Sequence, residues 1–421
     1  MQYQKKIMDN GVRLVAAPMA DKNSFSVGVW LNTGARNENA RISGISHFLE
    51  HIVFKGTTHY SCRKIKESIE GVGGSFNGFT SEEVTCYLVK IPARYWELAV
   101  DILSDMALYP LMKLSDVEKE RQVILEEIKM YKDLPQSFVH EMLDDLLWPG
   151  QQLGCSVLGT NESMKRISRD DLMQYKKSHY TSANIVLSVA GNLELKQVEE
   201  KVKRKFDLLR KSSLNPFAPA KKAAKKDRFK LLNKNTEQAH LALGFHAVPR
   251  GHRLRYAQSL LHVILGANSS SRLFNEIREN RGLAYEIGTQ VKRLKDDGAF
   301  IVHAGVANSK LEEAIKLIFS ELARIREKPV QASELSRAKE FYTGQLLLSL
   351  EDTLDHMLWI GEPTVTLDKT YTLEEVVRQI REVTSEDIQA VAKLILPEKT
   401  GQLALIGPFK GREKRLEGLL R

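Results

Sequence analysis

The chain has 421 residues, 43% of them apolar and 27% charged, which is the length of two domains and the composition of an ordinary globular protein. Its net charge of +9 is small for this length, which argues against a function in nucleic-acid binding. Isolated cysteines (Cys62, Cys86, Cys155), no apolar stretch of membrane-spanning length and no signal-peptide core in residues 1–20 predict a cytoplasmic protein with no membrane partner.

The first elements along the chain predict a sheet. Residues 3–8 and 12–17 flank the turn Asp9-Asn10-Gly11, a pattern typical of a β-hairpin. Alternating apolar residues at 25–31 continue the sheet, and residues 75–80 and 84–91 predict two further strands. Helices are expected at 63–70 and 95–108.

Between these strands, residues 44–53 predict an amphipathic helix that carries a metal site. At about 100° per residue, His47, Glu50 and His51 project from one face. The opposite, apolar face consists of Ile45, Phe48, Leu49 and Ile52. Imidazoles suit zinc, and Glu50 is placed to accept a proton from water, as in the H-x-x-E-H signature of inverzincins. A solvated trio without metal is the alternative, because so short a motif also arises by chance.

A long helix predicted at 115–132 offers the third ligand. Its apolar stripe consists of Val117, Ile124, Ile128 and Tyr131. Glu126 points straight out to solvent, whereas Glu127 lies on the flank of the stripe, so we favour Glu127. Glu120 lies two turns earlier on the same flank, where it is suited to accept the second N–H of a ligand histidine. An ordinary charged helix surface is the alternative for these glutamates.

The remainder of the chain repeats the pattern of its first part. Residues 211–228, with Pro216, Pro219 and a lysine run, predict a solvated linker. After it, residues 384–388 resemble 168–172, residues 403–407 resemble 187–191, and a strand and helix near 300–315 resemble 87–100. We therefore predict a zinc-binding half at 1–210 and a homologous half at 229–421. The helix at 256–266 has only His262, which predicts no metal site in the second half.

One further stretch of the second half, residues 271–285, predicts a helix ended by Gly282 and a strand that begins near Tyr285. Arg278 and Tyr285 are a cation and a phenol suited to a substrate carbonyl whose oxygen becomes negative during hydrolysis. From these residues alone, a helix-surface arginine and a strand tyrosine are the simpler interpretation.

The sequence resembles the pitrilysin family of inverzincins, specifically its shorter members related to the mitochondrial processing peptidase β subunit and its bacterial relatives. The similarity covers nearly the whole chain in the family's order. It rests on residues 47–51 with 54–57, 73–77, 120–127, 158–160 and 272–285. The chain departs from the pattern at Gly78, where relatives usually have Ala, and at Gln152, where many have His.

The resemblance implies an α+β fold of two homologous α/β-roll domains, each an antiparallel-rich sheet covered by helices, in chains that pair like a clam. It implies a zinc endopeptidase that hydrolyses peptides or unfolded polypeptide segments inside the chamber of a homodimer. A non-catalytic or heterodimer companion subunit, or a scaffold of the same family, is the alternative.

The same resemblance implies a role for individual residues. It agrees with His47, His51 and Glu127 as zinc ligands and with Glu50 as the base. It further implies Glu120 as a support behind the ligands, Asn77 in a strand that pairs with extended substrate, and Arg278 with Tyr285 acting on the substrate carbonyl at the partner's zinc.

Overall fold

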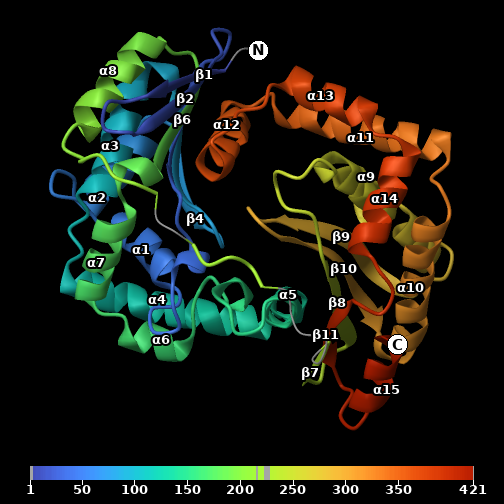
Figure 1. Cartoon of the computed structure of the whole chain (residues 1–421). Coiled ribbons are helices and arrows are strands. Elements are labelled where there is room, and N and C mark those ends of the chain that lie inside the picture. The colour runs from blue at the N-terminus through green and yellow to red at the C-terminus, as the bar shows by residue number, and fades with distance from the viewer. Residues whose placement is uncertain (1–2, 215–216, 222–227, 421) are drawn as a thin grey trace. The chain divides into compact units, whose positions relative to one another are not determined.

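The structure, a computed structural model, describes residues 3–214, 217–221 and 228–420 and contains two β-sheets surrounded by helices (Figure 1). It divides into two compact units. Unit 1 consists of Met1–Lys129, Ser156–Ala218 and Leu347–Leu373, and unit 2 of Met130–Cys155, Pro219–Leu346 and Glu374–Arg421. This division differs from the contiguous halves expected from the sequence, because each unit includes one helix from the opposite half of the chain.

Unit 1 contains a six-stranded sheet in the order β1-β2-β6-β3-β5-β4. The strands are β1 (Gln4–Ile7), β2 (Arg13–Pro18), β3 (Ser24–Leu31), β4 (Ser75–Thr80), β5 (Thr85–Pro92) and β6 (Ile185–Gly191). The predicted hairpin is confirmed by the antiparallel pairing of β1 with β2. Only β2 and β6 pair in parallel, and β4 is the edge strand beyond β5.

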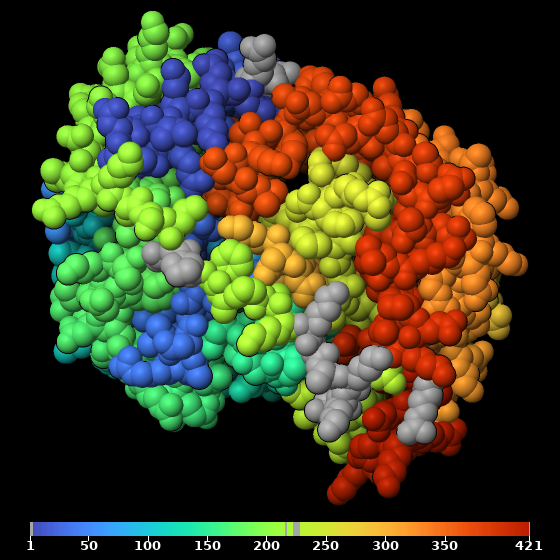
Figure 2. Space-filling view, in the orientation of Figure 1, coloured from blue at the N-terminus to red at the C-terminus, as the bar shows by residue number. Residues whose placement is uncertain are grey.

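Helices cover both faces of this sheet. The helices of unit 1 include α1 (Ile45–Val53), α2 (Cys62–Glu70), α3 (Trp96–Leu108), α6 (Asn161–Arg166), α7 (Arg169–His179) and α8 (Leu195–Phe206). Of these, α1, α3 and α8 pack on one face (Figure 1). Helix α12 (Thr353–Leu367) packs on the other face against β2, β3 and β6, and Figure 2 shows its orange-red segment beside the blue N-terminal segment. Gly361 allows this close approach, because a Cβ there would collide with the indole of Trp30.

Unit 2 contains a five-stranded sheet in the order β7-β11-β8-β10-β9. The strands are β7 (Phe229–Asn233), β8 (Gln238–His246), β9 (Ala284–Arg293), β10 (Gly298–Ala307) and β11 (Gln402–Gly407). The helices of this unit, or mostly of it, are α5 (Pro135–Leu147), α9 (Arg255–Gly266), α10 (Leu311–Glu327), α11 (Ala332–Ser349), α13 (Leu373–Glu382), α14 (Ser385–Ile395) and α15 (Glu413–Glu417). Helix α5 packs on β8 and β11, α9 on β9 and α10 on β10.

The two sheets share one plan. Apart from β1, each has a parallel outer pair (β2 with β6, β7 with β11) followed by three antiparallel strands that end in an edge strand. The short echoes in the sequence have the same local structure, since Ser168 with Asp171 and Thr384 with Asp387 form capping boxes at the starts of α7 and α14. Helix α5 covers the second sheet as α12 covers the first, so the repeats exchange one helix.

Two connections in the chain differ from simple linkers. Helix α4 (Leu114–Asp133) begins in unit 1 and ends in unit 2. Within the predicted linker, Ala218 accepts hydrogen bonds from Arg36 in unit 1, whereas the Lys221 backbone exchanges two hydrogen bonds of 2.7 Å with the Gln151 amide in unit 2. The described linker residues are therefore held by specific contacts; most of the lysine run lies outside the described residues. Of the helices described, none is long and apolar enough to cross a membrane.

Candidate metal centre

Helix α1 begins without a capping side chain, because its N-cap is Gly44 with φ of 87°. Glu38 takes over this function from six residues earlier. Its two carboxyl oxygens accept the N–H of Gly44 at 2.6 Å and that of Ser46 at 2.9 Å. Burial raises the pKa of Glu38 to about 8, although both N–H donors act in the opposite direction. The start of the helix is thus fixed by a buried carboxyl group that the sequence analysis did not identify.

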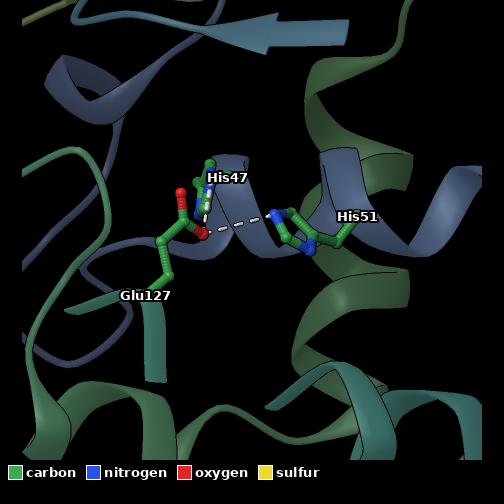
Figure 3. Close-up of side chains that lie close together, drawn as sticks. All are labelled: His47, His51 and Glu127. Atoms are coloured by element: carbon green, nitrogen blue, oxygen red, sulfur yellow. Dashed lines mark ion pairs between the residues drawn. The ribbon is translucent and has the colours of Figure 1, made fainter. Parts of the chain in front are cut away.

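The predicted trio meets at one point (Figure 3). The same carboxylate oxygen of Glu127 lies 3.7 Å from Nε2 of His47 and 3.7 Å from Nε2 of His51. The two imidazole rings are 4.6 Å apart and stand edge to face. Glu126, the alternative on α4, is exposed and pairs with Lys129 at 2.6 Å. The helical-wheel choice between the two glutamates therefore agrees with their positions.

These three groups fit a zinc ion. Two imidazole nitrogens and a carboxylate oxygen are a typical donor set for catalytic zinc, and their atoms all lie within 4.8 Å of one another. Tetrahedral ligands of zinc stand about 3.4 Å apart, close to the separations seen here. The distances of 3.7 Å are too long for direct hydrogen bonds, so without an ion these groups do not satisfy one another.

Glu120 lies behind His51, as expected for a supporting residue. One of its oxygens is 3.1 Å from Nδ1 of His51, and the other accepts from Lys55 at 2.6 Å. A hydrogen bond from Nδ1 to the carboxylate leaves Nε2 of His51 with its lone pair directed at the centre. Lys55, four residues after His51, was not singled out from the sequence.

Burial sets the protonation of the first ligand. It lowers the pKa of His47 to about 3, and the neighbouring His51 acts in the same direction, so His47 is neutral at pH 7 and ready to donate to a metal. Burial also raises the pKa of Glu127, while His51 opposes this shift. A divalent cation at the centre would favour the carboxylate of Glu127, because positive charge stabilises the ionised form.

Glu50 projects from the same face of α1 and is 9% exposed. The hydroxyl of Thr80 on β4 donates a hydrogen bond of 2.5 Å to its carboxylate. Burial raises the pKa of Glu50, and the hydrogen bond from Thr80 acts in the opposite direction. Gly78 lies on the same side of β4, where an added Cβ would be 3.1 Å from Cγ of Glu50. Thr80, like Glu38 and Lys55, was not identified from the sequence.

Asn77 lies on the edge strand that flanks Glu50. It is exposed, and its side-chain oxygen accepts the N–H of Gly78 at 2.9 Å. Residues along β4 alternate between exposed and half-buried, as expected for a strand with one face on the core. Its outer edge has backbone groups available to pair with an extended peptide.

Arg278 and Tyr285 belong to unit 2, whereas the trio belongs to unit 1. Arg278 lies on a π-helix (Phe274–Glu279), and its guanidinium stands over the rings of Phe274 at 4.7 Å and Tyr285 at 5.4 Å. The pairing of β9 with β10 shifts register beside Tyr285, which is 76% exposed. A bulge and a π-helix are devices that present side chains at functional sites, and the sequence pattern revealed neither.

Sequence comparisons place these features among known proteins. A sequence model described as "Insulinase (Peptidase family M16)" matches residues 14–161, and one described as "Peptidase M16 inactive domain" matches residues 166–342. A Bacillus subtilis protein named uncharacterized zinc protease YmxG is 37% identical, with 95% of this chain and 97% of that protein covered. A Streptomyces coelicolor protein, also named an uncharacterized zinc protease, is 32% identical, with 97% and 90% covered.

Solved structures show the same fold. A protease from Helicobacter pylori superposes with a TM-score of 0.89 at 22% identity, covering 97% of this chain and 100% of that chain. A Pseudomonas fluorescens protein described as a peptidase M16 inactive domain gives a TM-score of 0.90 at 18% identity, covering 97% and 98%. The predicted mixed α/β architecture with two sheets is thereby confirmed.

Proposed function

We propose that this chain, which belongs to peptidase family M16, the insulinase family, is a zinc-dependent endopeptidase. The assignment to a family of zinc peptidases made from the sequence motifs is confirmed by these relatives. The observation that carries the proposed activity is the convergence of His47, His51 and Glu127, with Glu50 on the same helix and within one turn of His47.

The residues of α1 and α4 would divide the work of peptide hydrolysis. Zinc held by His47, His51 and Glu127 would acidify water and polarise the peptide carbonyl. Glu50 accepts the proton of the attacking water and transfers it to the leaving amine. The burial that raises the pKa of Glu50 suits this exchange, because it makes the carboxylate a stronger base.

Substrate would bind along the edge strand β4. An extended peptide can add a strand to a sheet edge and be recognised through its main chain, which suits peptides or unfolded polypeptide segments of varied sequence. Asn77 is exposed on this strand beside the residues that face Glu50, so its amide is available to a bound peptide.

The second unit would contribute to the reaction in a pair of chains. Arg278 and Tyr285 are close together, and both carry donors suited to a developing oxyanion. We infer a homodimer in which these residues serve the zinc site of the partner, enclosing a chamber. A cytoplasmic location remains our prediction for this assembly.

A non-catalytic companion subunit is the second candidate. It is supported by the match of residues 166–342 to a domain described as inactive and by the absence, among the residues described in unit 2, of a cluster of three metal-ligand side chains. Retention of the trio together with Glu50 in unit 1 favours the enzyme.

Cleavage of a quenched, unstructured basic peptide tests the proposal. Wild-type chain, loaded with zinc, is compared with Glu50→Gln, with zinc content measured in both. We expect wild type to cut and Glu50→Gln to lose about 10³-fold or more in kcat while both keep the metal. Zinc in both proteins and cleavage by neither would favour the companion subunit. Cleavage by Glu50→Gln at a rate near wild type would refute the assigned base.

A further inference from the structure

The carboxylate of Glu50 has one hydrogen-bond donor among the described residues. This donor is the hydroxyl of Thr80, at 2.5 Å. The aromatic side chains nearby do not substitute for it, because the hydroxyls of Tyr87 and Tyr180 bond to each other at 2.6 Å. A buried carboxylate that loses its only donor is free to rotate.

The strand that carries Thr80 also limits the space around Glu50. Phe76, Gly78 and Thr80 alternate on the half-buried side of β4, and Gly78 lies opposite Tyr87 on β5. A Cβ on Gly78 would lie 3.2 Å from an oxygen of Glu50 and 3.0 Å from the ring of Phe54. One side of the carboxyl group is therefore bounded by strand β4, and the hydrogen bond from Thr80 holds it at that boundary.

We propose that Thr80 is a positioning residue for Glu50, so that edge strand β4 both presents its backbone to substrate and orients the base. The inference rests on the proposed peptidase function. Its physical content is that Thr80 engages one oxygen of Glu50 and leaves the other available to the attacking water. A peptide paired to β4 would then lie in fixed register with the base, because the same strand determines both positions.

Replacing Thr80 by valine removes the hydroxyl and keeps the branched shape. We expect Thr80→Val to lower kcat by about 10- to 100-fold with KM changed less than about threefold, because orientation of the base matters in the transition state more than in binding. Zinc content should stay at the wild-type value. Thr80→Ser keeps the hydroxyl and should restore kcat to within about threefold of wild type.

Thr85 supplies a matched control. It lies directly opposite Thr80 on β5, is fully buried, and donates its hydroxyl to the backbone oxygen of Thr33 at 3.0 Å. Thr85→Val makes the same chemical change at a hydroxyl that bonds to Thr33 and not to Glu50. We expect it to lower the melting temperature and to leave kcat within about twofold of wild type.

Crystal structures of the zinc-loaded proteins give a readout that does not depend on activity. The proposal expects the Glu50 carboxylate to be ordered as in wild type in Thr80→Ser, and rotated or split between positions in Thr80→Val. An unchanged Glu50 in Thr80→Val, equal loss of kcat in the valine and serine variants, or loss of zinc from Thr80→Val would overturn it. If wild type cuts no peptide, the peptidase proposal fails, and the orientation of Glu50 still decides the role of Thr80.

Discussion

In both units a helix packs against the edge strand of the sheet, but different side chains meet at the two contacts. In unit 1, α1 packs on β4, and Thr80 donates to Glu50. In unit 2, α9 packs on β9, and the hydroxyl of Thr289 is 2.7 Å from Nδ1 of His262. Both contacts therefore contain a threonine and a titratable group, although among the described residues only the contact in unit 1 adjoins a candidate metal centre.

The difference lies in how the histidines are distributed. Unit 1 has two histidines within one turn of α1, with Glu127 facing both. Half-buried histidines of unit 2, in contrast, lie on separate elements, such as His140 on α5, His262 on α9 and His303 on β10. In the described part of unit 2 no three ligand atoms come together. Each unit thus has a polar contact between a helix and its edge strand. The spacing of a few side chains decides whether that contact can hold a metal.

The largest effect is expected on zinc content, when a histidine of unit 1 and a histidine of unit 2 are replaced in turn. Alanine at His47 removes one of three ligands, so we expect His47→Ala to lose nearly all stoichiometric zinc after dialysis, measured by plasma emission spectrometry. His262→Ala in unit 2 is the matched variant and should keep one zinc per chain. Equal zinc content in both variants would mean that the trio is not the metal site.

A smaller loss of zinc binding is expected when Glu120, which lies behind the ligand His51, is replaced. Glu120→Gln leaves a weaker acceptor for Nδ1 of His51 and disrupts the pair with Lys55, so zinc affinity should fall about 10- to 100-fold in a chelator competition. Glu126→Gln, on the same helix but exposed, is the control and should bind zinc like wild type. Indistinguishable affinities in the two variants would remove Glu120 from the site.

The capping of α1 gives a comparison in stability. Glu38→Gln retains one carbonyl oxygen for two N–H groups, so the free energy of unfolding should fall by about 1–3 kcal/mol. Thr384→Ala removes the cap of α14 in unit 2 and should cost about 1 kcal/mol. Urea denaturation of the metal-free proteins measures both. If Glu38→Gln lowers the free energy of unfolding no more than Thr384→Ala does, the burial of Glu38 does not strengthen its cap on α1.

The smallest effect is a pH dependence in unit 2. Burial lowers the pKa of His140 and of His262 to about 4 and also lowers that of His303. Between about pH 6.5 and 4 the unfolded chain binds protons that the folded unit does not, so the free energy of unfolding should fall as the pH falls through this window. His262→Gln should reduce that slope in pH-dependent urea titrations. A slope unchanged by His262→Gln would mean that its imidazole titrates normally.

Local pattern was sufficient to predict the parts of the site that lie within single elements. The i, i+3, i+4 spacing brought His47, Glu50 and His51 to one face of α1, and the wheel of α4 separated half-buried Glu127 from exposed Glu126. The alternation of β4 likewise followed from its residues. In these cases one helical or strand period determines the direction of the side chain.

Most of the missed features depend on packing between distant segments. Glu38 caps a helix from outside any local capping motif, and Thr80 meets Glu50 across 30 positions of sequence. The exchange of α5 and α12 between units has no local sign, because the sheet that each helix covers is set by its contacts with distant strands. The two contiguous halves predicted from the sequence therefore differ from the compact units by these two helices.

Anomalous diffraction at the zinc edge, from crystals of the zinc-loaded wild-type chain, would locate the bound metal without reference to activity. We expect one strong peak per chain, within about 2.0–2.2 Å of Nε2 of His47, Nε2 of His51 and a carboxylate oxygen of Glu127, and no comparable peak in unit 2. An ordered structure with no peak at the trio, or with the strongest peak beside His140, His262 or His303, would contradict this expectation.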